Sequence, residues 1–412
     1  MATENLWIPA VIAAASLVSL AMSLRAVKRR RIIDDTPTSK TTGVFIGMVE
    51  LSGHACAEQP VTSYLANTEC VHFAWSIEEH WERTVRETYT DSNGKTQTRT
   101  RTESGWTTID SGGETIPFLL KDDHGEVLVH PEGADLHTLN IFSETCTPLD
   151  DLYFGKGPNS AIANSTHKRR FREEAIPHGS PVYLIGQARE RADAVAAEIA
   201  ASSDASMFVI SVHGEEGVRS NFGWAFRGWF LLGGILAYIV QRTLPGTHSD
   251  SSPLIHAVAP LLYSALWCGG WSLTVFNSIT SLRRRVEQAA SNVDVMLKRR
   301  NDLIPQLINC VQGFSSHESS LHEQLAKIRR SAESSESTVP TLVAIAEAYP
   351  SMSSDSGFLS LQQELTNTET RIALARAYYS EIASFFNART ELVPDRWICK
   401  VLPNLQPFPL HA

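Results

Sequence analysis

Asn292-Val-Asp-Val-Met-Leu-Lys-Arg-Arg-Asn-Asp-Leu-Ile-Pro-Gln-Leu307 is the stretch of this chain that decides most of its fold. Apolar residues in and around it are three or four positions apart, at Val286, Ala290, Val293 and Leu297 and then, one heptad on, at Ile304, Leu307, Val311 and Phe314. This heptad seam predicts a long amphipathic helix that packs against other helices, as in a coiled coil. Pro305 should bend the helix, because its ring removes one backbone hydrogen bond.

A second pattern of the same spacing runs over 358–386. Its seam positions include Leu361, Leu365, Ile372 and Tyr379. Two such helices, with a polar loop and a short helix at 342–349 between them, predict an antiparallel helical bundle over 280–412. The seams would also allow self-association, so a homo-oligomer is expected.

Three apolar blocks of membrane length precede the bundle, at 6–24, 222–240 and 254–279. As helices, each is long enough to cross the hydrocarbon core of a bilayer. A signal peptide is the alternative for the first block, but the five residues before it carry no positive charge. A helical hairpin buried in a soluble protein is the alternative for the other two.

Basic residues gather directly after the first and third blocks. We expect them to contact lipid headgroups, and they are Arg25, Lys28, Arg29, Arg30, Arg31, Arg283, Arg284 and Arg285. By the positive-inside rule both runs face the cytoplasm and the N-terminus lies outside. The sequence thus predicts a multi-pass, multi-domain α+β membrane protein. Its expected parts are an anchor (1–31), a β-rich cytoplasmic domain (40–220), a transmembrane hairpin (222–279) and the bundle.

Residues 40–220 change to strand periodicity. Val71, Phe73, Trp75 and Ile77 alternate with smaller or polar residues, which is typical of a strand with one buried face. A tight turn at Asn93-Gly94 and a second hairpin over 117–129 follow. With a further strand at 207–212, these segments predict a small antiparallel sheet or barrel.

Two other segments of this region carry weaker signals. Residues 187–201 are rich in alanine and predict a helix. The basic run 168–172 is typical of a solvated face, with headgroup contact as the alternative.

Composition and motif spacing exclude several function classes. A formal net charge of -9 argues against a general nucleic-acid binder. None of the six cysteines forms a C-x-x-C pair, so no zinc ribbon or RING is expected. The cysteines are expected as free buried thiols, or as a Cys56–Cys70 disulfide in an oxidising compartment. His317 and His322 are five positions apart, one too many for the H-E-x-x-H metal motif. No catalytic residue, metal or cofactor is predicted.

The β-rich region resembles the GIDE domain of membrane-anchored ubiquitin ligases over about 40–220. The resemblance rests on Gly47-Met-Val49, Glu69-Cys-Val-His-Phe73, Asp123-His-Gly-Glu-Val-Leu-Val129 and Glu173-Glu-Ala-Ile-Pro-His-Gly-Ser-Pro-Val-Tyr-Leu-Ile-Gly186. Those ligases transfer ubiquitin through a zinc-binding RING. Because this chain lacks the RING ligands, the resemblance implies only a sheet-rich module beside a membrane.

The C-terminal region resembles the LemA family over about 275–410. The matching segments are Ser291 to Pro305, Gln312-Gly-Phe314, Ala346-Glu-Ala-Tyr-Pro350, Thr368-Glu369 and Ala375-Arg-Ala-Tyr-Tyr379. The resemblance implies an elongated helical bundle anchored at a bacterial inner membrane. Family members usually carry one N-terminal membrane helix, whereas here the equivalent helix is the third.

These features favour a non-enzymatic scaffold that is anchored in the lipid bilayer and organises membrane proteins, with a membrane-protein client as a further expected partner. One alternative is a ligase-like enzyme or hydrolase. Another is an adaptor in envelope stress or protein quality control.

Overall fold

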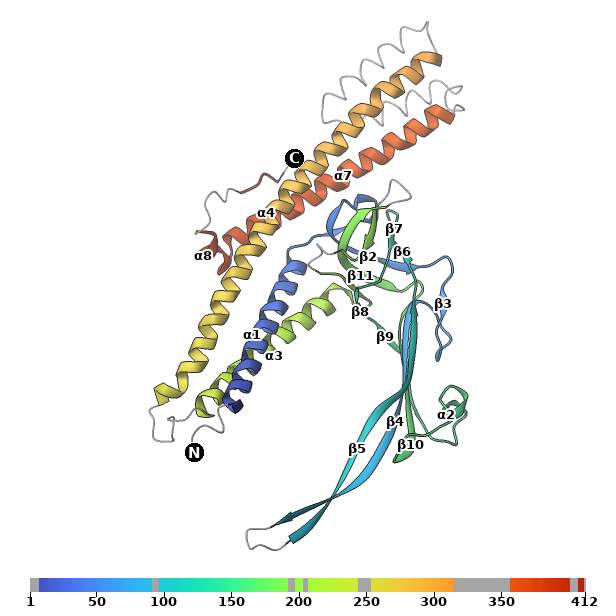
Figure 1. Cartoon of the computed structure of the whole chain (residues 1–412). Coiled ribbons are helices and arrows are strands. Elements are labelled where there is room, and N and C mark those ends of the chain that lie inside the picture. The colour runs from blue at the N-terminus through green and yellow to red at the C-terminus, as the bar shows by residue number, and fades with distance from the viewer. Residues whose placement is uncertain are drawn as a thin grey trace. The chain divides into compact units, whose positions relative to one another are not determined.

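The computed structural model describes residues 7–90, 96–191, 197–202, 207–243, 253–314, 356–400 and 407–410. The chain divides into a helical unit, formed by Met1–Phe45 with Arg219–Ala412, and a sheet unit, formed by Ile46–Val218. Figure 1 shows helices in the first and strands in the second. The mixed fold with a β-rich middle region, predicted from the sequence, is therefore confirmed.

The helical unit is built from four long helices, α1 (Trp7–Asp34), α3 (Gly214–Thr243), α4 (Pro253–Phe314) and α7 (Ser356–Glu391), among the described residues. Two short elements join them, the 3-10 turn η1 (Thr41–Gly43) and the helix α8 (Asp395–Cys399). The short strand β1 (Thr38–Ser39) follows α1. The third apolar block and the amphipathic stretch form one continuous helix, α4, of 62 residues. At about 1.5 Å per residue α4 is roughly 90 Å long. It continues through Pro305 to Phe314.

Helices α4 and α7 pack side by side and antiparallel (Figure 1). Their shared core consists of buried apolar side chains: Val275, Ile279, Leu282, Val286, Ala289, Val293, Ala375, Tyr379, Ile382, Ala383, Phe386 and Cys399. Two ion pairs flank it, Arg299 to Glu364 at 2.8 Å and Arg300 to Glu369 at 3.7 Å. The predicted polar loop, the helix at 342–349 and the two histidines lie outside the described residues.

One sheet of the sheet unit closes on itself. Strands β2 (Gly47–Cys56), β6 (Phe118–Lys121), β7 (Glu126–Val129), β12 (Ala197–Ala200) and β11 (Pro181–Glu190) pair in that order, and β11 pairs with β2. Strands β13 (Val209–Ser211) and β8 (Asp135–His137) extend it. The predicted barrel is thus present, but it is not purely antiparallel, because β12–β7 and β13–β8 are parallel pairs.

In the second sheet the strands pair in the order β3 (Val61–Thr62), β4 (Glu69–Thr90), β10 (Ser165–Pro177) and β9 (Leu139–Cys146). Strand β5 (Thr96–Thr115) also pairs with β4, and the short helix α2 (Asp151–Gly155) precedes β10 in the chain. Strands β4 and β5 continue beyond their neighbours as a long two-stranded arm (Figure 1). The rings of Trp81 and Trp75 lie over Gly105 and Gly112 of the partner strand, in space that a Cβ atom would enter. A bulge leaves Ile109 unpaired, and its side chain packs into the core.

Two predictions for this unit are wrong. Residues 187–190 and 197–200 form strands, because Ala188 and Ile199 are buried in the sheet and tertiary pairing outweighs helix propensity. The run 168–172 is not a solvated face, because it alternates within β10 and so buries Arg169 and Phe171. The expectation of free thiols is confirmed for Cys56, Cys70 and Cys146, of which the last two are buried, and the alternative Cys56–Cys70 disulfide is not formed.

Candidate functional site at the basic end of the helical unit

Three helices of the helical unit are long and apolar enough to cross a membrane, within Trp7–Asp34, Gly214–Thr243 and His256–Gln306. Serine hydroxyls of α1 donate to backbone carbonyls of α3: Ser16 to Gly233 at 2.9 Å, Ser19 to Trp229 at 2.7 Å and Ser23 to Phe226 at 3.2 Å. In these three pairs the residue number increases along α1 and decreases along α3, so the two helices are antiparallel. Small polar side chains of this kind let membrane helices approach closely.

Helices α1 and α4 run parallel. The indole N–H of Trp267 donates to the hydroxyl of Ser23 at 3.1 Å, and Leu24 lies against Gly270, where a Cβ would meet its side chain at 2.5 Å. Further along both helices, Arg285 donates to the hydroxyl of Thr36 at 2.5 Å. The end of α1, the beginning of α3 and the arginines of α4 therefore meet at one end of the three-helix group, which we call the basic end.

Charged residues at and just after the end of α1 form ion pairs with residues from distant parts of the chain. Arg31 donates two hydrogen bonds to the carboxylate of Asp395 in α8, at 2.9 and 2.8 Å. Arg389 of α7 donates to Asp35 at 2.9 Å, and its guanidinium also lies 3.5 Å from Asp395. These contacts fix the α7–α8 corner to the end of α1.

Two more contacts complete the group. The Nε of Arg219, on α3, lies 2.7 Å from Asp34, and Arg30 reaches the same carboxylate at 3.8 Å. We define the basic cluster as Arg30, Arg31, Arg219, Arg285 and Arg389 with Asp34, Asp35 and Asp395. Its five guanidinium groups and three carboxylates give a net charge of +2.

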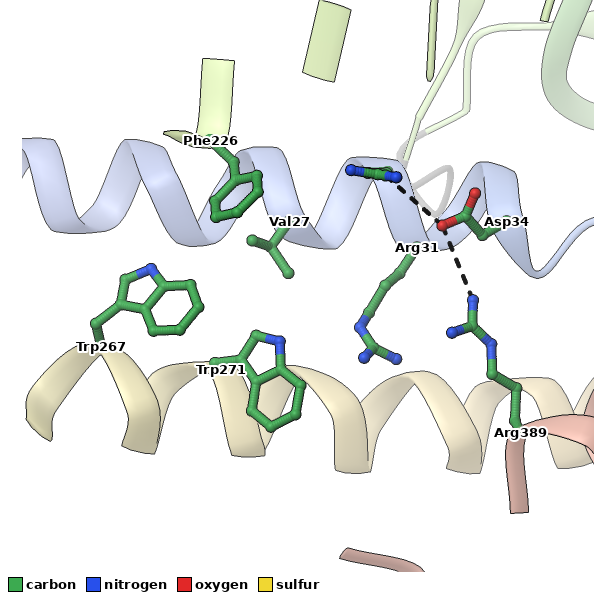
Figure 2. Close-up of a pocket in the computed structure, with 8 residues that line it drawn as sticks. Val27, Arg31, Asp34, Phe226, Trp267, Trp271 and Arg389 are labelled. Atoms are coloured by element: carbon green, nitrogen blue, oxygen red, sulfur yellow. Dashed lines mark ion pairs between the residues drawn. The ribbon is translucent and has the colours of Figure 1, made fainter. Parts of the chain in front are cut away.

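A pocket of about 200 Å³ opens beside the basic cluster (Figure 2). It is lined by Val27, Arg30, Arg31, Asp34, Phe226, Trp267, Trp271 and Arg389. Figure 2 shows the aromatic rings toward one end and the charged groups toward the other. Helices α1, α3, α4 and α7 each contribute to the lining, so the pocket depends on the packing of the whole helical unit.

The residues predicted to contact headgroups divide into two groups. Arg25, Lys28, Arg29, Arg283 and Arg284 are exposed, with Arg29 over the ring of Phe222 at 5.6 Å and Arg283 paired with Glu287 at 3.1 Å. Arg30, Arg31 and Arg285 instead belong to the basic cluster, where their guanidinium groups contact residues of the same unit.

The predicted seam residues lie within the helical unit where their side chains are described. Val293, Ile304, Leu365, Ile372 and Tyr379 are buried, and Leu297 and Leu361 are half-buried. The side chains of Leu307, Val311 and Phe314 lie outside the described residues. Because Val293 and Tyr379 belong to the core between α4 and α7, this part of the seam is occupied within one chain.

The sheet unit contains a second buried ionic group, around Arg169. All five guanidinium N–H groups have acceptors: Glu79 at 3.4 and 3.3 Å and the carbonyls of Tyr153, Pro158 and Ser160 at 2.9, 2.7 and 3.1 Å. Arg169 and Glu79 are both 0 % exposed. Burial raises the pKa of the Tyr153 hydroxyl, which donates to Glu79 at 3.3 Å.

Sequence reasoning missed most of the basic cluster, namely Asp34, Asp35, Arg219, Arg389 and Asp395. The one local signal was the pair of aspartates directly after the basic run of α1, at the end of a helix where acidic residues are unfavourable unless paired. Among the described residues, no group of three His, Cys, Asp or Glu side chains is placed to hold a metal ion.

Comparison with known families gives two matches. The LemA family model matches residues 289–409, and the GIDE model, described as E3 Ubiquitin ligase, matches residues 86–242. Each covers less than half of the chain. No curated protein and no solved structure matches it.

Proposed function

We propose that this chain, in which a GIDE-type region is fused to a C-terminal LemA-family region, is a non-enzymatic scaffold anchored in a bacterial inner membrane. The observation that carries the proposal is the direction of the three helices. Helices α1 and α4 run parallel, and α3, which lies between them in chain order, runs antiparallel to both. The chain leaves the basic end of the helical unit toward residue 46 and returns to it at residue 219. Both water-soluble parts would therefore face the cytoplasm, and the N-terminus would lie outside.

The corner between α7 and α8 supports a bilayer surface at this end. Leu392, Val393 and Trp397 are exposed at 60, 59 and 64 %. They flank Asp395, which is bound to Arg31 at the end of α1. Tryptophan is enriched where the hydrocarbon core meets the headgroups, so these side chains would enter the interface beside the exposed basic residues of α1.

The scaffold would hold membrane proteins through two extended surfaces. One is the β4–β5 arm, along which most side chains of β5 are exposed. The other is the outer face of the α4–α7 pair. Since the described seam is occupied within one chain, a second copy would bind to this outer face, which includes the exposed Val295 and Leu359.

Extraction in a mild detergent followed by mass photometry tests the proposal. A scaffold should give a homogeneous particle that contains several copies or a defined second membrane protein. A monomer with no partner, both after extraction and after cross-linking in intact membranes, would contradict it.

The description of the GIDE model favours one other candidate, a ligase-like transferase. Ligases with a RING hold two zinc ions through cysteine and histidine, so metal analysis separates the two functions. Stoichiometric zinc in the purified protein, with ubiquitin transfer lost on chelation, would replace the scaffold by an enzyme.

A further inference from the structure

One weakly paired cation of the basic cluster, Arg30, lines the pocket. Arg30 is half-buried, with 36 % of its side chain exposed, and the nearest carboxylate oxygen, on Asp34, is 3.8 Å away. Its guanidinium lies against Gly223 of α3, where a Cβ would approach it to 3.1 Å. The glycine thus leaves room for a guanidinium group whose donors can bind an incoming ligand.

The charge around the pocket selects an anion. Three arginines and one aspartate line it, and two N–H groups of Arg31 are already bound to Asp395. Arg389 also faces carboxylates, Asp35 at 2.9 Å and Asp395 at 3.5 Å, so Arg30 supplies the donors that remain on the pocket side. A guanidinium group that faces an open space matches the geometry and charge of a phosphate-type oxyanion, which accepts bidentate hydrogen bonds.

The opposite end of the same pocket is apolar. Phe226 and Trp267 stack with their ring centroids 6.2 Å apart, and Trp271 and Val27 extend this surface toward Arg31. A free inorganic anion would leave these rings unused. A ligand with one charged end and one hydrocarbon end would contact both parts of the lining.

We propose that the pocket binds an anionic amphiphile, with its phosphate-type headgroup on Arg30 and its hydrocarbon chain beside Phe226, Trp267 and Trp271. The volume of about 200 Å³ lies below the roughly 300–1,000 Å³ of pockets that enclose a whole drug-sized ligand. Only the headgroup and the start of the chain are therefore enclosed, and the rest lies along the apolar helices. This placement rests on the proposed insertion of the three helices, which puts the pocket at headgroup depth.

The test uses the full-length protein in a neutral detergent and native mass spectrometry, with dihexanoyl phosphatidic acid as the probe. One molecule should bind per chain. Arg30→Gln should weaken binding about tenfold, because it removes a charge-assisted hydrogen bond. Lys28→Gln is the matched control, since it makes the same charge change on an exposed position of the same helix, and its affinity should stay within about twofold.

Two further arms separate the sources of the anion. Inorganic phosphate should not displace the probe at equal concentration, and dihexanoyl phosphatidylcholine should bind at least about tenfold more weakly. Equal losses in the Arg30 and Lys28 variants would overturn the pocket, because binding would then follow net charge alone. Equal affinity for inorganic phosphate would overturn the apolar half of the site. Binding in detergent is independent of topology and copy number, so its failure is distinct from failure of the scaffold.

Discussion

The sheet unit and the helical unit each contain arginines paired with carboxylates, but the two groups differ in burial and in net charge. In the sheet unit, Arg169 and Glu79 are both fully buried, and every guanidinium N–H has an acceptor. In the helical unit, the basic cluster has more guanidinium groups than carboxylates, and Arg30 remains over a third exposed. The first group is neutral and closed, whereas the second keeps positive charge beside a pocket.

This difference separates a structural role from a binding role. A buried ion pair is stable only when hydrogen bonds satisfy all of its atoms, which leaves nothing for a ligand. A half-exposed cluster with excess charge gains from a bound anion instead. Substitutions in the two groups test that distinction.

Arg169→Met should destabilise the sheet unit most. It removes the cation that pairs with the buried Glu79, which keeps only the hydroxyl donors of Tyr153 and Ser165, and it frees three carbonyls, at a cost of about 3–5 kcal/mol. Hydrogen exchange of peptides covering 150–175 in the full-length protein should become much faster. Unchanged exchange would show that the closed group does not hold this region.

Ile382→Ala tests whether the stability of the helical unit resides in the α4–α7 core. Ile382 is 0 % exposed, so the cavity should cost about 2–5 kcal/mol and lower the melting temperature. Gln363→Ala, at an exposed position of the same helix, is the control and should change stability by less than about 0.5 kcal/mol. Equal melting temperatures for the two variants would contradict the burial of Ile382 between α4 and α7.

Asp395→Asn probes the basic cluster from its acidic side. Asp395 is 4 % exposed and bound by Arg31 and Arg389, so losing its charge should cost about 1–3 kcal/mol. Arg30→Gln should cost less than about 0.5 kcal/mol in the same thermal melts, because its ion pair is long and half-exposed. The reverse order would assign Arg30 a structural role and remove the contrast with Arg169.

The sheet unit should also respond to alkaline pH. Burial, together with Glu173 and Glu114, raises the pKa of the Cys70 thiol to about 11 from 9.0. The folded state then holds the proton more tightly than the unfolded state, so this stabilisation is complete below pH 9 and declines as pH rises from 9 to 11. The parent should lose about 1 kcal/mol more than Cys70→Ala between pH 8 and pH 10 in urea unfolding. If the free energy of unfolding of both proteins changed with pH in the same way, the Cys70 thiol would not be buried away from water.

Periodicity in the sequence was sufficient for the elements that a local pattern of residues marks. The long helices α4 and α7 and the hairpin of β6 and β7 lie where apolar spacing and turn residues indicate. Both resemblances rest on short motifs in the sequence, and family models match the chain over residues 289–409 for LemA and 86–242 for GIDE.

Other features depend on contacts between distant residues, which no local pattern reveals. Residues 187–190 form a strand because the closing sheet outweighs the helix propensity of alanine. Arg169 is buried because α2 and the carbonyls after it surround its guanidinium. The basic cluster joins Arg31 to Asp395 across 364 positions, so the basic run could be read only as a lipid-facing surface.

Protease protection of tagged chains in sealed inner-membrane vesicles of known orientation shows on which side of the membrane each part of the chain lies. Cleavable tags are placed within 91–95, within 244–252 and after residue 412, each in a separate chain. The account predicts that the first and third tags are accessible from the cytoplasmic side and the second only from the other side. Tags within 91–95 and after residue 412 found on opposite sides would contradict it.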